Sequence, residues 1–301
     1  MEVRRPKIPE GRSLRLPGRG RTWIYDTGPP AEDGASAIVL LHGWTSTAAL
    51  NWYRCIGPLA EKHRVVALDH RGHGRGIRSR RPFRLEDCAD DVAALVDELD
   101  LREPIVVGYS MGGPIAQLLW RRHPDRVGGL VLCATAGRFA VRREFGGLMA
   151  VAGFGVSLAL SGIPYEVRRR GVGYVLRNRS PMSGALEWAI QEWERNDPAA
   201  MIQAGLAIGR FDSTSWLGEI DVPVSVVVTS LDTTVSPNRQ RRLAERIPGS
   251  TTFDVEGTHR ACVDEARVFV PVLKAACESV EQRAAGRKPG DTLSRSASAL
   301  P

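Results

Sequence analysis

The chain has 301 residues, of which 43% are hydrophobic and 25% are charged. This composition excludes a chain that is disordered throughout, and the length suffices for one large α/β domain, with or without an insertion. The net charge of +7 comes mainly from arginines that are spread along the chain. Because no basic stripe with interleaved aromatic residues occurs, we expect no nucleic-acid partner, and at most a weak attraction to anionic membrane surfaces or acidic partners.

The first residues of the chain and the cysteines indicate the cellular compartment in which the protein is expected. Residues 1–20 are rich in charge and lack the apolar core of a secretory signal, so we expect a basic N-terminal extension and a cytoplasmic location. The five cysteines are odd in number and include no C-x-x-C pair. We therefore expect reduced cysteines that serve packing, and no metal or organic cofactor. They are Cys55, Cys88, Cys133, Cys262 and Cys277.

Short apolar runs alternate with helical patterns along most of the chain. The pattern predicts strands at residues 21–27, 37–41, 64–69, 104–107, 127–133, 222–229 and 251–255. It predicts helices at 50–62, 85–99, 114–122, 237–247 and 261–278. Such alternation is typical of an α/β fold with a mostly parallel, doubly wound sheet and helices on both faces.

The alternation stops in the middle of the chain. Residues 137–215 contain no strand-like run, only helical patterns such as those at 185–195 and 199–208. We expect a core made of residues 21–136 and 216–281, a helical lid insertion at 137–215, and a disordered tail at 282–301. Ligands of open α/β sheets bind beyond the carboxyl ends of the strands, so the insertion would cover the site.

One stretch of the insertion, residues 145–165, carries no charge and is long enough to span a membrane. Its five glycines and Pro164 lower both its hydrophobicity and its helix propensity. A crossing here would also separate Ser110 from every residue after 221. We therefore expect a lid helix that lines an apolar pocket, with an interfacial helix that contacts lipid as the alternative, in which case the protein associates peripherally with a membrane.

Residues 108–113 read Gly-Tyr-Ser-Met-Gly-Gly and lie between a predicted strand and a predicted helix. This is the G-x-S-x-G pattern of a nucleophile elbow, in which a serine sits on a sharp, strained turn and its neighbours must be small. The pattern alone is common by chance. In this context it makes Ser110 the candidate nucleophile.

A serine nucleophile needs a histidine to take its proton and a carboxylate to orient that histidine, and in this arrangement they follow in the order Ser, Asp, His. Asp232 follows the predicted strand 222–229, and His259 follows the strand 251–255. Asp212 is a reserve acid because no strand leads into it, and Asp254 lies within a strand pattern. The remaining histidines do not fit the expected order: His42, His63, His70, His73 and His123.

A tetrahedral intermediate also needs hydrogen-bond donors for its oxyanion. The backbone N–H of Met111, directly after the nucleophile, is one candidate. The backbone N–H of Trp44, after His42 and Gly43 at the end of an early strand, is the other.

Taken together, these motifs resemble the α/β-hydrolase family over roughly residues 21–280. The matches are His42-Gly43, the Asp-His-Arg-Gly-His-Gly loop at 69–74, the elbow, Asp232 before Val-Ser-Pro, and His259. We interpret the 69–74 loop as structural. Thr229 departs from the pattern because relatives often have glycine there, and the insertion carries no signature that we recognise.

A serine at the elbow sets this chain apart from the relatives that dehalogenate haloalkanes or open epoxides, which use aspartate there. The resemblance implies a serine hydrolase, esterase-like or lipase-like, that cleaves a small-molecule carboxylic ester through an acyl-enzyme, and the apolar lid favours a lipid-like acyl group. Alternatives on the same fold are a C–C bond hydrolase, a thioesterase and a cofactor-free perhydrolase. A non-catalytic ligand receptor or an acyltransferase that keeps the triad also remains open. The sequence does not predict the oligomeric state.

Overall fold

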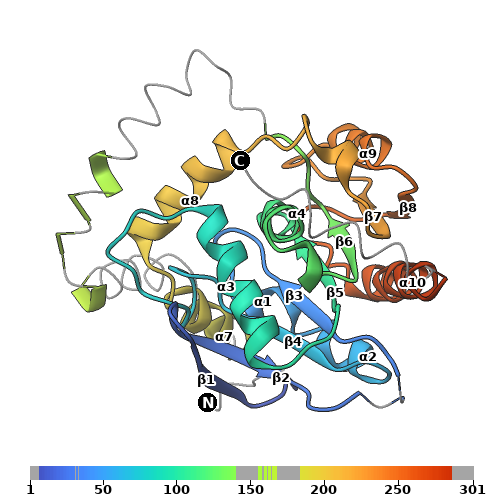
Figure 1. Cartoon of the computed structure of the whole chain (residues 1–301). Helices are drawn as coiled ribbons and strands as arrows, with labels where there is room; N and C mark the ends of the chain where they lie inside the picture. Colours follow the sequence, from blue (N-terminus) through green and yellow to red (C-terminus); the bar gives the residue numbers. More distant parts are fainter. Residues whose placement is uncertain are drawn as a thin grey trace.

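The computed structural model describes residues 7–30, 32, 34–139, 155–157, 159–160, 162–163, 165–167 and 184–286. Eight strands form a sheet with the order β1-β2-β4-β3-β5-β6-β7-β8 (Figure 1). β2 runs antiparallel to both of its neighbours, and the pairs from β4 to β8 are parallel. The strands are β1 (Gly11–Leu16), β2 (Gly20–Asp26), β3 (Ile38–Leu41), β4 (Val65–Leu68), β5 (Ile105–Tyr109), β6 (Gly129–Cys133), β7 (Val224–Thr229) and β8 (Thr251–Val255).

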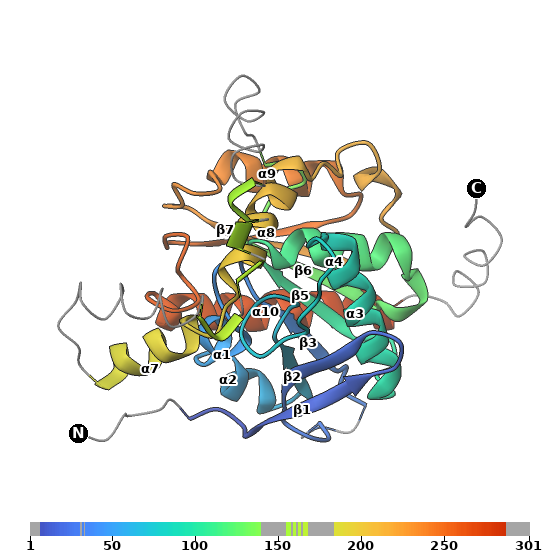
Figure 2. The ribbon, with the colours of Figure 1, turned by 90° about the vertical axis from the view of Figure 1, so that its left-hand side faces the viewer.

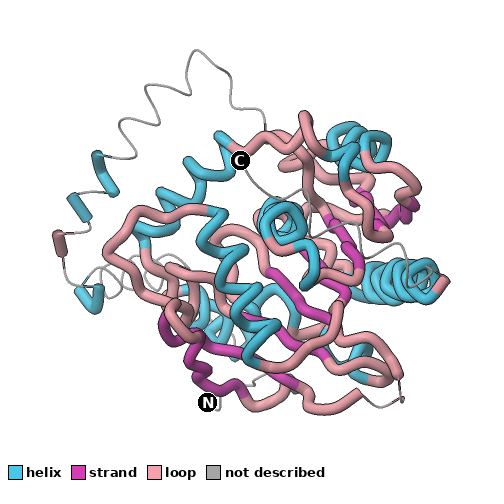
Figure 3. The backbone as a smooth tube through the Cα atoms, in the orientation of Figure 1, coloured by secondary structure: helices cyan, strands magenta, loops and turns pink. Residues whose placement is uncertain are grey.

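Helices connect the strands and flank the sheet, as the tube in Figure 3 makes plain. They are α1 (Ala48–Trp52), α2 (Ile56–Ala60), α3 (Leu85–Glu98), α4 (Gly112–Arg122), α7 (Gly184–Trp193), α8 (Pro198–Arg210), α9 (Pro237–Arg246) and α10 (Ala266–Ala285). Two short 3-10 helices are η1 (Pro124–Arg126) and η2 (Leu217–Glu219). α3 and α4 pack against each other, and α7 lies beside α1 (Figure 2).

The sheet has two apolar faces because successive residues of a strand point to opposite sides. Val39 and Val106 belong to the core on the side of α3, α4 and α9. Ile38 and Ile105 belong to the core on the side of α1, α2 and α10. Both faces are therefore buried, which explains why the central strands are continuous apolar runs instead of alternating ones.

The alternation of strands and helices predicted the fold class correctly, but several elements differ in detail. β1 lies within the expected N-terminal extension, where only Leu14 and Leu16 pack toward the core, so the apolar pattern was too weak to predict a strand. The predicted helix at 50–62 is two helices, α1 and α2. A continuous helix would bring the ring of Pro58 against the carbonyl of Arg54. α10 runs to Ala285 and so includes the first four residues of the expected tail.

The insertion is only partly described. α7 and α8 overlap the helical patterns predicted at 185–195 and 199–208, and each begins one residue earlier. Most of the apolar stretch 145–165 lies outside the described residues, as does the tail from residue 287. Among the residues that are described, no helix is long and apolar enough to span a membrane.

Candidate active site

Ser110 occupies the turn between β5 and α4 with a φ of 51°, a conformation that residues other than glycine rarely adopt. Its backbone is held on both sides. The N–H of Ser110 donates to the carbonyl of Cys133 at 3.0 Å, and its carbonyl accepts from the hydroxyl of Thr135 at 2.8 Å. The strained serine is therefore fixed by groups at the carboxyl end of β6, as expected of a turn that must project one side chain from the sheet edge.

The glycines around Ser110 are required by close approach of the backbone. A Cβ at Gly108 would collide with the carbonyl of Gly112, and a Cβ at Gly112 would collide with the carbonyl of Leu41. Strand β5 and helix α4 can therefore meet at this angle only because these positions lack side chains.

Ser110, His259 and Asp232 form a continuous hydrogen-bonded row. The Nε2 atom of His259 lies 3.0 Å from the Oγ of Ser110, and its Nδ1 atom lies 2.7 Å from Oδ2 of Asp232. Asp232 follows β7 and His259 follows β8, whose carboxyl ends lie at the same edge of the parallel sheet as that of β5. The parallel arrangement thus brings together residues that are 149 positions apart.

The Asp232 carboxylate is buried and densely hydrogen-bonded. Its Oδ1 accepts the backbone N–H groups of Thr234 and Val235 at 2.8 and 2.9 Å, and its Oδ2 also accepts the hydroxyl of Thr229 at 2.9 Å. Burial alone would raise the pKa of Asp232. The hydrogen bond and charge of His259, with the bonds from Val235 and Thr229, outweigh burial and lower the pKa below its usual value. Asp232 therefore stays ionised to face the imidazole.

Two further side chains around Asp232 escaped the sequence analysis. Thr229, noted there only as a departure from glycine, is a hydrogen-bond donor to the carboxylate. Gln240 on α9 bonds to the Thr229 hydroxyl at 2.9 Å, to Oδ2 of Asp232 at 3.3 Å and to the carbonyl of Val235 at 2.7 Å. A signal existed in the sequence, because Gln240 shares the apolar stripe of an otherwise charged helix with Leu243 and Ala244.

Tyr109, the residue before the nucleophile, also contacts the loop of the histidine. Its hydroxyl donates to the backbone carbonyl of His259 at 3.0 Å. Burial raises the pKa of Tyr109 well above its usual value, so the hydroxyl remains a donor.

The loop after β3 passes directly beside the nucleophile. A Cβ built on Gly43 would lie 3.4 Å from the Cβ of Ser110, which puts the Gly43–Trp44 segment next to the elbow. The N–H of Gly43 donates to Oδ1 of Asn51 at 2.9 Å, and Asn51 in turn donates to the sulfur of Cys262 at 3.4 Å. The expected oxyanion donors, Trp44 and Met111, thus belong to the two loops that flank Ser110.

The indole of Trp44 contacts the insertion. Its Nε1 donates to the carbonyl of Met201 on α8 at 2.8 Å, and the ring lies so close to Gly205 that a Cβ there would be 2.8 Å from Cζ2. The loop beside the nucleophile and helix α8 are therefore in direct contact.

The 69–74 loop is held together by buried polar groups. Asp69 accepts the N–H groups of Ala48 and Arg75, both at 2.8 Å, and Arg71 pairs with Asp91 at 2.7 Å. His70 donates its backbone N–H to Nε2 of His42 at 3.0 Å. These contacts join the loop to α1 and α3, in line with a structural role.

Three of the histidines that do not fit the triad order form a buried cluster. The ring of His42 lies 4.4 Å from that of His70 and 5.4 Å from that of His73, measured between centroids. Burial lowers the pKa of His42 to about 4 and that of His73 to about 3, and it lowers the pKa of His70 well below its usual value. The cluster is therefore neutral at physiological pH.

The reserve acids lie elsewhere. Asp212 pairs with Arg138 at 3.4 Å and accepts from Thr214, and Asp254 pairs with Arg241 at 2.7 Å. His63 contacts the carbonyl of Ser36 at 3.0 Å, and His123 contacts Asp90 at 2.8 Å.

The five cysteines are buried and unbridged. Over the ranges that the structure describes, no group of three or more His, Cys, Asp or Glu side chains could hold a metal ion.

Comparisons with known proteins agree with this geometry. A model of the alpha/beta hydrolase fold matches residues 36–168. The pimeloyl-[acyl-carrier protein] methyl ester esterase of Neisseria meningitidis is 27% identical over 258 residues, which are 85% of this chain and 81% of the esterase. The chain therefore has the alpha/beta hydrolase fold, and esterases are among the proteins to which it is similar.

Solved structures carry the same fold. The thermophilic esterase of Thermogutta terrifontis superposes with a TM-score of 0.71 at 22% identity and covers 90% of this chain and 99% of its own. The enol-lactonase of Burkholderia xenovorans has a TM-score of 0.69 at 22% identity and covers 89% of this chain and all of its own. At 22% identity these two superpositions show a shared fold.

Proposed function

We propose that this chain is a serine hydrolase that cleaves carboxylic esters, with Ser110 as nucleophile, His259 as general base and acid, and Asp232 as the orienting carboxylate. One observation carries the proposal: Ser110 Oγ, both ring nitrogens of His259, and Oδ2 of Asp232 form a single hydrogen-bonded row of 3.0 and 2.7 Å. A hydroxyl becomes an effective nucleophile at neutral pH when a base at this distance can take its proton.

In the first half of the reaction, Ser110 Oγ attacks the ester carbonyl while Nε2 of His259 takes the hydroxyl proton. Asp232 holds the Nδ1 proton and stabilises the imidazolium that forms. The tetrahedral intermediate then collapses, and the leaving alkoxide takes the proton from Nε2 and departs as an alcohol. The acyl group remains on Ser110 as an ester.

The developing oxyanion would be bound by the backbone N–H groups of Trp44 and Met111. Gly43 lies against Ser110, and its own N–H is engaged by Asn51, which supports a fixed position for the next peptide. Fixed donors of this kind stabilise a negative charge without reorganisation, and one of them typically contributes a factor of about 10²–10³ in turnover.

In the second half, His259 takes a proton from water, the resulting hydroxide attacks the acyl carbon, and Ser110 leaves with the proton returned from Nε2. The acyl group is released as a carboxylic acid. No metal or organic cofactor enters any step. We infer an apolar or lipid-like acyl group, supported by the uncharged stretch at 145–165 and by a relative named for a pimeloyl methyl ester.

We also propose that residues 137–215 act as a lid over Ser110, between the core segments 21–136 and 216–281. The contact between Trp44 and α8 supports this, because it joins the insertion to the loop beside the nucleophile. The chain length of preferred substrates would then depend on the insertion.

The test is covalent labelling with a fluorophosphonate probe, followed by turnover of p-nitrophenyl esters of increasing acyl chain length. Wild type should be labelled on Ser110 and should hydrolyse the esters, whereas Ser110→Ala should do neither. His259→Ala should lower turnover by about 10³-fold or more. The matched control is Ser250→Ala, directly before β8, which should retain labelling and turnover.

Two outcomes would contradict the proposal. A folded wild-type protein that resists the probe would be a ligand receptor and no enzyme. A labelled protein that passes its acyl group to added alcohols in preference to water would be an acyltransferase. Mass spectrometry of the acylated Ser110 peptide and of the released acid separates the two.

A further inference from the structure

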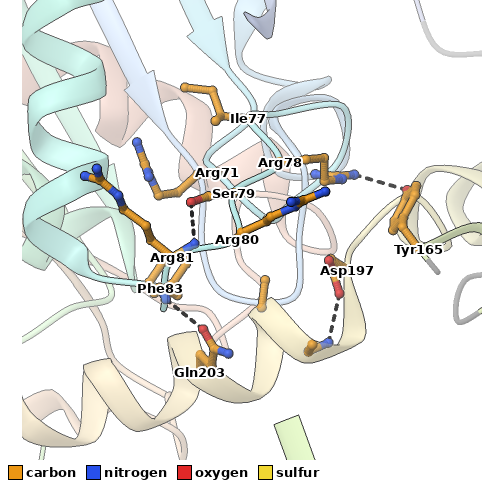
Figure 4. Close-up of a pocket in the computed structure, with 13 residues that line it drawn as sticks. Arg71, Ile77, Arg78, Ser79, Arg80, Arg81, Phe83, Tyr165, Asp197 and Gln203 are labelled. Atoms are coloured by element: carbon orange, nitrogen blue, oxygen red, sulfur yellow. Dashed lines mark hydrogen bonds between the residues drawn. The ribbon is translucent and has the colours of Figure 1, made fainter. Parts of the chain in front are cut away.

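A cavity lies away from the Ser110 row, between the segment that follows β4 and the insertion. Its volume is about 630 Å³. Figure 4 shows residues 77–83 on one side and α8, with Gln203 and the preceding Asp197, on the other. Hydrogen bonds join the two sides: Gln203 accepts the backbone N–H of Phe83 at 2.7 Å, and the backbone N–H of Asp197 donates to the carbonyl of Gly72 at 2.9 Å.

The lining is strongly cationic. Arg71, Arg78, Arg80 and Arg81 contribute to it, and Asp197 is the one carboxylate among the described residues that line the cavity. The charge of Arg71 is matched by Asp91 at 2.7 Å. Among the described residues, by contrast, no carboxylate forms an ion pair with Arg78, Arg80 or Arg81. Three positive charges thus face the cavity against one negative charge.

One of these arginines is held rigidly. The guanidinium of Arg78 donates to the carbonyls of Gly76 at 3.1 Å and Arg195 at 2.7 Å, and it lies 4.6 Å from the ring centre of Tyr165. Its partners are neutral, so the bonds orient the group while its charge remains available. Arg80 and Arg81 are exposed and have no side-chain hydrogen bond within the described part of the chain.

The remaining surface of the cavity is apolar or neutral. Ile77 and Phe83 are buried side chains at its wall, and Ala199 and Ala200 form the wall on α8. A cavity of this volume is far larger than a single inorganic phosphate needs and falls within the range of small-molecule sites. Guanidinium groups recognise phosphate by charge-assisted, often bidentate hydrogen bonds.

We propose that this cavity is a binding site for a small soluble organic phosphate, with the phosphate on Arg78, Arg80 and Arg81 and an apolar or aromatic body against Phe83 and Ala199. The site is separate from the proposed active site. Ala199, Ala200 and Gln203 line the cavity, whereas Trp44 contacts Met201 and Gly205, and a period of 3.6 residues puts these two sets on different sides of α8.

The test measures binding of phenyl phosphate by isothermal titration calorimetry at low salt, with inorganic phosphate and benzyl alcohol as partial ligands. Phenyl phosphate should bind more tightly than either. Arg80→Ala/Arg81→Ala should weaken it by at least about tenfold. Arg239→Ala/Arg242→Ala on α9 removes the same charge elsewhere and should leave binding unchanged. Ser110→Ala should bind phenyl phosphate like wild type, so this result does not depend on ester hydrolysis.

Three results would overturn the proposal. Equal affinity of the pocket double variant and the α9 double variant would mean that only net charge matters. Phenyl phosphate that binds no better than inorganic phosphate would remove the apolar part of the site. Binding of wild type to vesicles containing phosphatidylglycerol, dependent on Arg80 and Arg81 and without binding of phenyl phosphate, would make this face a lipid-binding surface.

Discussion

Asn51 and Gly43 are joined by a hydrogen bond of 2.9 Å between the Gly43 N–H and the Asn51 amide oxygen. Asn51 is buried in α1 and does not contact the row of Ser110, His259 and Asp232 in the bonds described above. It acts as a positioning residue for the peptide that leads into Trp44. We expect Asn51→Ala to lower kcat for p-nitrophenyl esters by about tenfold with little change in KM, because oxyanion donors act mainly in the transition state.

A lower kcat with an unchanged KM distinguishes a positioning role of Asn51 from a general loss of structure. Asn238→Ala, at an exposed position on α9, is the matched control and should behave like wild type. A folded Asn51→Ala variant with unchanged kcat would show that the Gly43 peptide is held without the amide.

Thr229 is predicted to stabilise the protein through the ionised form of Asp232. A hydrogen bond to a charged group contributes about 1.5–3 kcal/mol, so Thr229→Val should lower the free energy of unfolding by about this amount at neutral pH. The folded-state pKa of Asp232 lies below its ordinary value. The contribution of ionised Asp232 to the free energy of unfolding is therefore fully present above the unfolded-state pKa. This contribution is lost as the pH falls through the folded-state pKa.

The measurement is urea unfolding of wild type and Thr229→Val at neutral and at acid pH. The difference between them should shrink in acid, when Asp232 is protonated in both states. Thr233→Val, next to Asp232 but exposed, should give a small difference at either pH. A difference for Thr229→Val that is the same at both pH values would exclude the charged partner as its cause.

The buried histidine cluster is predicted to make the fold sensitive to mild acid. His70 has no partner for either ring nitrogen among the described residues, and its pKa is lowered well below the usual value by burial, with smaller contributions from His42 and His73. As the pH falls below about 6.5, the unfolded chain binds protons that the folded chain excludes, so the free energy of unfolding decreases. His70→Phe removes one such group and should reduce this slope by up to about 1.4 kcal/mol per pH unit.

Denaturant unfolding over a series of pH values between neutral and moderately acid checks this. Above the ordinary histidine pKa the stabilities of the two proteins should run parallel, and they should diverge below it. Equal slopes in acid would mean that His70 is not kept neutral by burial.

The contact between Trp44 and Gly205 gives a prediction about activity. A side chain at Gly205 meets the indole ring, so Gly205→Ala should displace Trp44 and lower kcat/KM several-fold. In a Trp44→Ala background the same substitution should have almost no further effect, because the ring it displaces is gone. Gly57→Ala on α2, where a Cβ meets no atom within 4 Å, is the control.

This pair of variants forms a double-mutant cycle measured on ester hydrolysis. Additive effects of Gly205→Ala and Trp44→Ala would mean that the two residues act on turnover independently, contrary to the expected coupling.

The sequence predicted the fold class because the central strands are buried on both faces and therefore appear as short apolar runs between amphipathic helices. It also predicted the positions of Ser110, Asp232 and His259, since each follows its own strand and parallel strands share one carboxyl edge. The structure brings these three side chains within hydrogen-bond distance.

The sequence did not reveal the roles of residues whose contacts arise only when the chain folds. Asn51 lies in an ordinary helical pattern, and only the fold brings its amide beside Gly43. Gln240 is 8 residues from Asp232, but its partners depend on how α9 packs on β7. β1 is mostly exposed, so its pairing with β2 left little trace in the hydrophobic pattern.

The bond from Tyr109 to the His259 carbonyl spans from the strand of the nucleophile to the loop that carries the imidazole. The loop after β8 cannot drift away from the elbow unless this bond breaks. The separation of Ser110 and His259 is therefore set by a bond between two segments at the sheet edge, and α8 takes no part in that bond.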